Sequence, residues 1–135
     1  IQVIDELARD QLAHPPYGTT LTFPPETYTR FHQTSGTSGR PIIWLDNTQS
    51  WQWLLENWKT IWRSAGARAG DAVFFAFSFG PFLGFWTAFD SAQQLGLRTI
   101  PAGGMSSGER LRFLIAQRPR ILCCTPTYAL RLIDV

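Results

Sequence analysis

The chain has 135 residues, of which 44% are hydrophobic and 16% charged, and its formal net charge is +2 at pH 7. That length makes one domain, or part of one, and the apolar fraction is sufficient for a buried core. The positive charges are few and scattered, which excludes the basic surface of a nucleic-acid-binding protein, and no apolar stretch is long enough to span a membrane.

The cysteines and the first residues of the chain indicate in which cellular compartment the protein is expected. The adjacent Cys123 and Cys124 cannot build a disulfide framework, and they are typical of small apolar strand residues in the reducing cytoplasm. The segment from Ile1 to Glu6 lacks the basic start and cleavage site of a signal peptide. Because the chain begins with Ile1 and not with Met, we expect it to be part of a longer protein.

The first predicted elements surround a loop that is rich in glycine and hydroxyl residues. Apolar spacing predicts a short helix over residues 3–13, and the prolines of residues 14–26 predict an irregular connection. Strands are expected at residues 28–33 and 42–45, on either side of the loop. A helix should begin near Thr48 and stop at Gly66, with its tryptophans packed against the core.

The second half of the chain alternates between strand and helix patterns. Strands are expected at residues 72–77, 99–101 and 120–124, and helices at residues 83–95, after the Ser106–Glu109 capping box, and from residue 126 onward. The near-continuous apolar run at 72–77 is typical of a strand that is buried on both faces. This alternation predicts an α/β fold with a mostly parallel sheet, in a single partial domain covering residues 1–135.

The most informative segment is residues 34–41, which read Thr-Ser-Gly-Thr-Ser-Gly-Arg-Pro. Glycine and short hydroxyl residues favour turns, and together they can surround an anion with backbone N–H groups and hydroxyls. We therefore expect the loop to bind a phosphate chain. The plain alternative is a flexible Ser/Gly linker.

Three well-known motifs do not fit this loop. In a Walker A loop the second glycine, counted from Gly36, would fall on Pro41. A Rossmann fingerprint needs a third glycine and a helix after the loop, whereas a strand is expected here. A serine-hydrolase elbow needs Gly-x-Ser-x-Gly, and the two histidines of the chain, His14 and His32, give no sign of a catalytic triad.

The loop resembles the signature (Ser/Thr)-Ser-Gly-Thr-Thr-Gly-x-Pro of adenylate-forming enzymes, and its flanks resemble those of the phenylacetate–coenzyme A ligase family. In that family the loop is preceded by a strand that contains a histidine, which corresponds to His32 here. The loop is followed by a helix that starts at a threonine, which corresponds to Thr48. Residues 76–84 are similar to the family's Ala-Tyr-Gly-Tyr-Gly-Leu-Phe-Thr-Gly segment. Leu95-Gly96, Ile100-Pro101 and residues 124–130 also match, so the resemblance covers nearly the whole chain.

This resemblance implies part of the large N-terminal domain of an AMP-forming acid–coenzyme A ligase. Such an enzyme joins a carboxylic acid to the α-phosphate of ATP, releases pyrophosphate and then forms a thioester with coenzyme A. The phosphate-binding residues that it implies are Thr34, Ser35, Gly36, Thr37, Ser38, Gly39 and Arg40. Arg40 stands where many relatives have lysine, and either cation can pair with phosphate.

The resemblance also implies a pocket for the acid. Its residues are Phe77, Ser78, Phe79, Gly80, Phe82 and Gly84. An aromatic wall with glycine gaps suits an aryl or aryl-acetic acid. Phenylalanine replaces the family's tyrosines at Phe77 and Phe79, and Phe85 and Trp86 replace small residues. The alternative for each of these side chains is ordinary core packing.

The remaining machinery of the family is expected beyond residue 135. It includes the adenine-binding and Mg²⁺-associated segments and a lysine that contacts the α-phosphate, so the catalytic residues stay unknown, no metal ligand is assigned, and the chain alone should be inactive. The expected partners are a small carboxylic acid, ATP with Mg²⁺, and coenzyme A, with a second copy of the chain as a further candidate. The alternatives are an adenylating enzyme that uses another acceptor, such as a carrier-protein thiol, and a non-catalytic remnant that binds phosphate or a partner.

Overall fold

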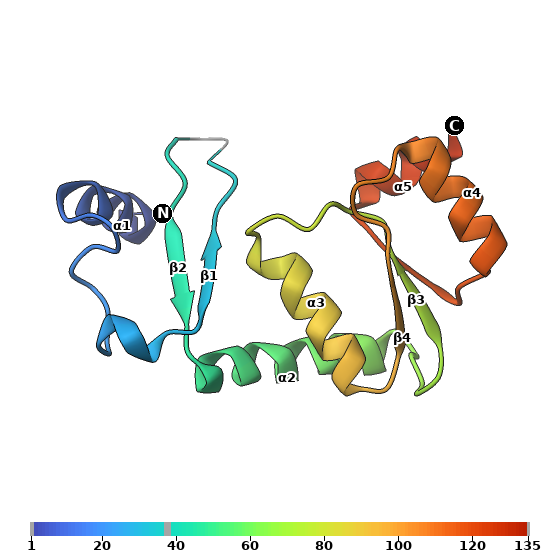
Figure 1. Ribbon diagram of the computed structural model, residues 1–135, viewed down its shortest axis with the longest axis horizontal. Helices are drawn as coiled ribbons and strands as arrows, with labels where there is room; N and C mark the ends of the chain where they lie inside the picture. The colour runs from blue at the N-terminus through green and yellow to red at the C-terminus, as the bar shows by residue number, and fades with distance from the viewer. Residues whose placement is uncertain (1, 37–38, 135) are drawn as a thin grey trace. The chain divides into compact units, whose positions relative to one another are not determined.

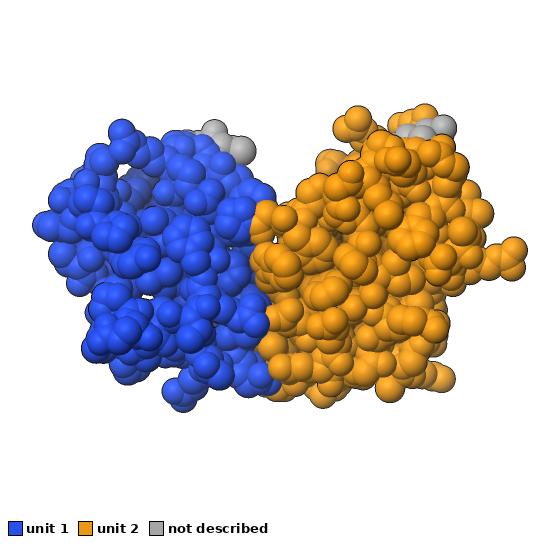
Figure 2. All heavy atoms as spheres, viewed as in Figure 1, with its two compact units in different colours: residues 1–53, 81–83 blue, residues 54–80, 84–135 orange. Residues whose placement is uncertain are grey.

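A computed structural model describes residues 2–36 and 39–134 of the chain. The chain divides into two compact units, one formed by residues 1–53 and 81–83 and the other by residues 54–80 and 84–135 (Figure 2). In the described part of the chain, no helix combines the length and the apolar character that crossing a membrane requires.

The first unit contains a helix and a β-hairpin. Helix α1 (Gln2–Ala13) is followed by the short 3₁₀ helix η1 (Pro25–Thr27), and the strands β1 (Arg30–Gln33) and β2 (Ile43–Asp46) pair antiparallel (Figure 1). The side chain of Gln11 fastens α1 to the hairpin, because its Nε2 donates to the Ile43 carbonyl at 2.8 Å and its Oε1 accepts from the Ile43 N–H at 2.9 Å. The helix and both strands expected from the sequence are therefore present.

Helix α2 (Thr48–Ser64) begins where its sequence predicts. The Oδ1 atom of Asn47 accepts a hydrogen bond from the Ser50 N–H at 2.9 Å, which satisfies one of the free donors of the first turn. After Ser64 the chain reaches Gly66 at a φ of +75°, a conformation that glycine adopts without strain. The expected core face is confirmed for Trp51, Leu55 and Trp62, which are buried.

The second unit is built on a parallel sheet. Its strands β3 (Ala72–Phe75), β4 (Arg98–Pro101) and β5 (Ile121–Cys123) lie in the order β4-β3-β5, so the central strand is β3. All residues of β3 are buried, as a strand covered on both faces requires. This confirms the parallel α/β arrangement, although β3 ends two residues earlier than the apolar run.

Three helices complete the second half of the chain: α3 (Leu83–Gln94), α4 (Ser107–Gln117) and α5 (Pro126–Ile133). The predicted capping box is present at α4, where the Ser106 hydroxyl accepts from the Glu109 N–H and the Glu109 carboxylate accepts from the Ser106 N–H at 2.8 Å. At α5, the Thr125 hydroxyl accepts from the Tyr128 N–H, and Pro126 occupies the first turn, where a missing N–H costs nothing.

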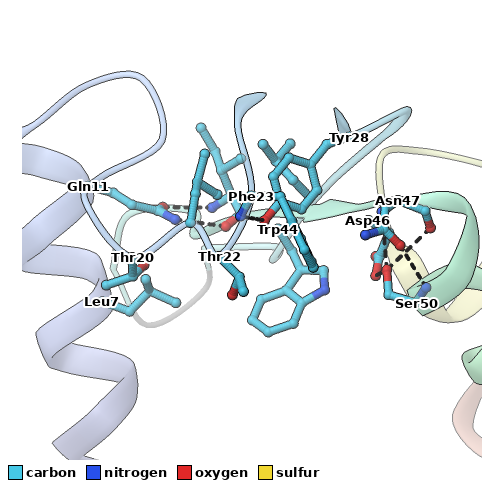
Figure 3. A pocket seen from close by; sticks show the side chains of 13 residues that line it. Leu7, Gln11, Thr20, Thr22, Phe23, Tyr28, Trp44, Asp46, Asn47 and Ser50 are labelled. Carbon is cyan, nitrogen blue, oxygen red and sulfur yellow. Dashed lines mark hydrogen bonds between the residues drawn. The ribbon is translucent and has the colours of Figure 1, made fainter. Parts of the chain in front are cut away.

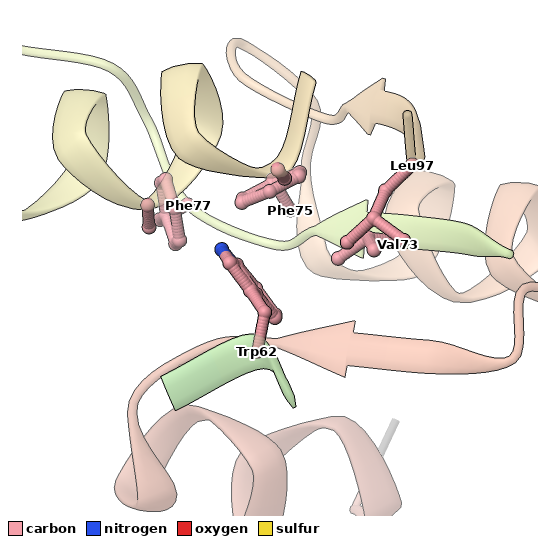
Figure 4. Close-up of a cluster of buried hydrophobic side chains, with 7 residues drawn as sticks. Trp62, Val73, Phe75, Phe77 and Leu97 are labelled. Carbon is pink, nitrogen blue, oxygen red and sulfur yellow. The ribbon is translucent and has the colours of Figure 1, made fainter. Parts of the chain in front are cut away.

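The sheet separates two apolar clusters. One contains Trp62, Val73, Phe75, Phe77, Ala88, Ala92 and Leu97 (Figure 4), and the other contains Phe74, Ala76, Ala102 and Leu132. The buried indole N–H of Trp62 donates to the Ser91 hydroxyl at 2.9 Å, so this polar group is satisfied within the core. Each large apolar side chain buried in this way contributes about 1.5–3 kcal/mol.

Candidate functional site

The glycine-hydroxyl loop joins β1 to β2, and its two ends are fastened to each other. The Thr34 N–H donates to the Ile42 carbonyl at 3.0 Å, and the Ile42 N–H donates to the Thr34 hydroxyl at 2.9 Å. On the outer side of β1, the Gln33 N–H donates to the Pro81 carbonyl at 2.7 Å. One bond between main-chain groups and one bond to the Thr34 hydroxyl therefore hold the two ends of the loop together.

Gly36 holds a conformation within the loop that other residues avoid. Its φ is +69°, and its carbonyl accepts a hydrogen bond from the Gly39 N–H at 3.0 Å. A Cβ atom at this position would lie 2.9 Å from Cδ of Pro41 and 3.0 Å from the Gly39 carbonyl oxygen. The turn therefore requires glycine at this position, both for the backbone angle and for the space.

The loop presents polar groups to solvent. Thr34, Ser35, Gly39 and Arg40 are exposed, and Gly36 is half-buried. The other two residues predicted for phosphate binding, Thr37 and Ser38, lie outside the described residues. The described part of the loop therefore offers hydroxyls, backbone groups and one guanidinium, which is the chemistry that a phosphate chain needs.

The strands that carry the loop also hold a buried polar pair that sequence reasoning missed. His32 on β1 and Asp46 on β2 are 4% and 2% exposed, and Nδ1 of His32 lies 3.8 Å from Oδ2 of Asp46. Oδ1 of Asp46 accepts a hydrogen bond from the Ser50 hydroxyl at 2.8 Å. The His32 ring stacks on Trp51 of α2, with ring centroids 5.0 Å apart and planes within 8°, and the Arg30 guanidinium lies 4.1 Å from the centroid of the same indole.

This cluster ties the loop to the start of α2. The sequence carries one signal for this cluster. Arg30 and His32 are two residues apart on a strand, so their side chains share one face of it. The partner that completes the pair, Asp46, could not be read as buried from its position before a helix. The sequence pattern singles out His32 only through the resemblance to the ligase family.

A pocket of about 230 Å³ lies along β2 in the first unit (Figure 3). Figure 3 shows the Gln11 side chain at one end and Asp46, Asn47 and Ser50 at the other, with the Trp44 ring between them. The amide of Gln11 is bonded to β2, and Asn47 and Ser50 serve the start of α2. These polar groups fasten the elements of the unit together, and no substrate role is assigned to them.

In the second unit, part of the predicted acid-binding segment lines an apolar cavity. The cavity has a volume of about 190 Å³, and its lining residues are Trp58, Phe77, Gly84, Phe85, Ala88, Cys123, Cys124 and Thr125. The rings of Phe77 and Phe85 are stacked, with centroids 4.2 Å apart. The structure thus places two of the sequence-predicted residues, Phe77 and Gly84, around one space.

The other predicted residues of the acid pocket lie elsewhere. The ring of Phe79 packs against Phe75, Trp86 and Phe89, which fits the alternative of core packing. The Gly80 carbonyl accepts a hydrogen bond from the Trp86 indole at 2.8 Å. The Ser78 side chain accepts from Arg110, and Phe82 belongs to the first unit.

The cavity has little polar character. Burial, together with the neighbouring Cys124, raises the pKa of the Cys123 thiol to about 11, and burial also raises the pKa of Cys124. Both cysteines are free, and both stay protonated near neutral pH, where a neutral thiol is a poor nucleophile. The two cysteines therefore act as apolar wall residues, as the sequence predicted. Among the described residues, no group of three or more His, Cys, Asp and Glu side chains could hold a metal ion.

Comparison with known proteins relates the chain to ligases. No protein-family model matches it. A phenylacetate-coenzyme A ligase of Pseudomonas putida is 32% identical over 123 residues, and one of Aromatoleum evansii is 31% identical over 122 residues. Each match covers 88% of this chain but 27% of the relative, so the chain spans little more than a quarter of the length of these relatives.

Solved structures agree with this relation. A crystal structure of 2-hydroxyisobutyryl-CoA ligase in complex with 2-HIB-AMP and CoA superimposes with a TM-score of 0.87 and 30% identity, over 97% of this chain and 28% of the other. A second structure of that ligase, in an open conformation, has a TM-score of 0.86 and 28% identity, over 97% and 30% of the two chains. The fold and the resemblance expected from the sequence are confirmed.

Proposed function

We propose that this chain provides the ATP-binding and acid-binding parts of an acid–coenzyme A ligase. The proposal rests on its relation to the adenylate-forming ligases, and in particular to phenylacetate–coenzyme A ligases, along most of its own length. In the proposed reaction, a carboxylate oxygen attacks the α-phosphorus of ATP, and the bond to the β,γ-pyrophosphate breaks. The thiol of coenzyme A then attacks the acyl carbon, and AMP leaves.

The observation that carries the phosphate-binding role is the geometry of the loop. Its ends are fixed by the bonds between Thr34 and Ile42, its turn depends on the positive φ of Gly36, and Ser35 and Arg40 are exposed on it. An exposed loop with a fixed neck can surround the β- and γ-phosphates with N–H groups and hydroxyls. With Thr37 and Ser38 of the same motif, these residues are proposed to hold the pyrophosphate while the α-phosphorus reacts.

Arg40 is proposed to carry the positive charge of this clamp. A guanidinium presents two parallel N–H donors to a phosphate and remains charged at every physiological pH. Charge that develops on the leaving pyrophosphate would therefore be stabilised by a group already in place.

Mg²⁺ is proposed to arrive with ATP and not to be held by this chain alone. Magnesium usually binds through one or two carboxylates together with substrate phosphates and waters. The described residues offer no cluster of carboxylates or histidines of the size that a protein-held ion needs. The role of this chain is then to bind the phosphates that carry the metal.

The acid is proposed to enter the cavity of the second unit. Its walls are the Phe77 and Phe85 rings, Trp58 and the two neutral thiols, so an apolar group is favoured over a polar one. The volume of about 190 Å³ is close to that of an apolar cavity of about 150 Å³ that binds benzene. An acid with a single aromatic ring, an aryl or aryl-acetic acid, suits this space better than a long acyl chain.

Pyrophosphate exchange in the complete protein tests the loop. Ser35→Ala and Thr37→Ala together should slow the acid-dependent exchange of labelled pyrophosphate into ATP by about tenfold or more, because hydrogen bonds to charged groups are each worth about 1.5–3 kcal/mol. Ser64→Ala removes an exposed hydroxyl at the end of α2 and serves as the control. Exchange that proceeds at the wild-type rate in the double variant would exclude the phosphate-binding role.

A further inference from the structure

Arg110 is a buried cation whose hydrogen-bond acceptors are uncharged. It lies on α4 with 7% of its surface exposed. Its Nε donates to the Ala102 carbonyl at 2.8 Å, and its Nη2 donates to the Ser78 hydroxyl at 3.2 Å. These two bonds leave further N–H donors of the guanidinium, which has five.

No carboxylate among the described residues forms an ion pair with Arg110. The ion pairs in that part of the chain join other groups, such as Arg120 with Asp71 and Lys59 with Glu56. Burying a guanidinium without a counter-charge is costly, and neutral acceptors offset only part of that cost. The position of Arg110 thus carries a positive charge that an external anion can balance.

The Ser78 hydroxyl and the Tyr128 ring contact this guanidinium, and a further hydroxyl, that of Ser107, is bonded to Tyr128. The guanidinium carbon lies 5.2 Å from the ring centroid of Tyr128 on α5, and the Tyr128 hydroxyl lies 3.1 Å from the hydroxyl of Ser107 on α4. Ser78, after β3, is exposed, so the cluster reaches solvent on that side. Burial acts to raise the pKa of Tyr128, but hydrogen bonds with Ser107 and Arg110 and the charges of Arg110 and Arg131 outweigh it, so the pKa lies below its usual value.

The cluster lies at the edge of the sheet where ligands usually bind. Ser78 follows the carboxyl end of β3, and α5, which carries Tyr128, follows the carboxyl end of the adjacent parallel strand β5. In open α/β sheets, ligands occupy the region outside the carboxyl ends of the strands. A buried cation and several hydroxyls at that edge form an arrangement suited to an oxyanion.

We propose that Arg110, with the hydroxyls of Ser78 and Tyr128, forms a second oxyanion-binding site in this protein, which takes a carboxylate or a phosphate group. The guanidinium supplies the charge, and the two hydroxyls orient the oxygens. The source of the oxyanion rests on the proposed function: it is either the carboxylate of the acid or a phosphate of ATP or coenzyme A.

Anion-dependent stabilisation of the complete protein tests the site without any reaction. Melting temperatures are measured in rising inorganic phosphate and, separately, in rising sodium phenylacetate, at constant ionic strength set with NaCl. A ligand that binds the native state raises the melting temperature, and the rise should be lost in Arg110→Met. Arg112→Met removes an exposed arginine from the same helix and should behave like the wild type. Because Arg110 is buried, Ser78→Ala and Tyr128→Phe supply variants that keep the guanidinium and should weaken anion binding about tenfold.

Steady-state kinetics then distinguish the sources of the oxyanion. If the site holds the substrate carboxylate, Tyr128→Phe and Arg110→Lys raise the KM of the acid about 10- to 100-fold and leave those of ATP and coenzyme A unchanged. A rise confined to ATP or coenzyme A identifies a phosphate. If neither anion stabilises the wild type more than NaCl does and no KM changes, Arg110 is a structural residue and the proposal fails. If the protein activates no acid, the proposed function fails, and the stabilisation measurements still decide on the site.

Discussion

Phe77 and Phe85 stack almost face to face, with ring centroids 4.2 Å apart and an angle of 17° between their planes. Phe77 follows the central strand β3, and Phe85 lies in the first turn of α3. The contact therefore joins the carboxyl end of the sheet to this helix. Both rings line the apolar cavity of the second unit, as does Gly84, the residue before Phe85. The relationship between the two rings therefore sets one wall of the space proposed for the acid.

Gly84→Leu should narrow that space without damaging the fold. A Cβ atom at Gly84 would meet no atom within 4 Å, and Gly84 lies in the helix α3, where glycine costs about 1 kcal/mol relative to alanine. We expect the KM for an aryl acid to rise at least tenfold while the KM for a short acid such as propionate changes little. Initial rates of pyrophosphate release over a panel of acids measure both.

The control for this substitution is Gln93→Leu, which places the same side chain at an exposed position of α3. It should leave the acid preference unchanged. If Gly84→Leu activates large and small acids in the wild-type ratio, the cavity is not the acid site. The melting temperature of each variant separates a change in specificity from a loss of folded protein.

Gly36→Ala should damage the phosphate loop specifically. Alanine at a φ of +69° is strained by roughly 1–2 kcal/mol, and its Cβ would lie 2.9 Å from Pro41. We expect a lower free energy of unfolding, measured in urea, and a rise of about tenfold or more in the KM of the complete protein for ATP.

Gly70→Ala is the matched control for the backbone strain. Gly70 has a φ of +89°, but a Cβ atom there meets nothing within 4 Å, and the residue lies outside the loop. Gly70→Ala should reduce stability by a similar amount and leave the KM for ATP unchanged. Equal KM values for ATP in both variants would show that the loop geometry has no bearing on nucleotide binding.

The capping box of α4 should make stability depend on pH in the acid range. Hydrogen bonds from the Ser106 side chain and backbone lower the pKa of Glu109 from its ordinary value of 4.5. Because the folded-state pKa is the lower one, the stabilisation is fully present above the ordinary value and is lost as the pH falls through the folded-state value. Glu109→Gln should therefore have a lower melting temperature than the wild type at pH 7, and the difference should shrink between pH 5 and pH 3.

Glu26→Gln, in the short helix η1, removes the same charge from another part of the chain and serves as its control. A difference between Glu109→Gln and the wild type that stays constant down to pH 3 would contradict the role of the carboxylate in the cap.

The local elements were predictable because their signals are local. Residues 72–77 predicted a strand buried on both faces, and the Ser106–Glu109 spacing predicted a cap, since periodicity and hydrogen bonds to near neighbours depend on adjacent residues. Asp46 shows the limit of such local signals. Its burial against His32 follows from the pairing of β1 with β2, which no local pattern predicts.

By itself, the amino-acid sequence determined the order of the elements and the turn at Gly36, and it is the basis for the phosphate ligand proposed for residues 34–41, because backbone conformation and side-chain chemistry are properties of short segments. Tertiary structure alone decided which side chains share a space. Phe77 lines a cavity while Phe79 packs into the core, and Arg110 reaches Ser78, 32 positions away in the chain. Such contacts depend on how the strands and helices pack, because packing brings together residues that no local pattern relates.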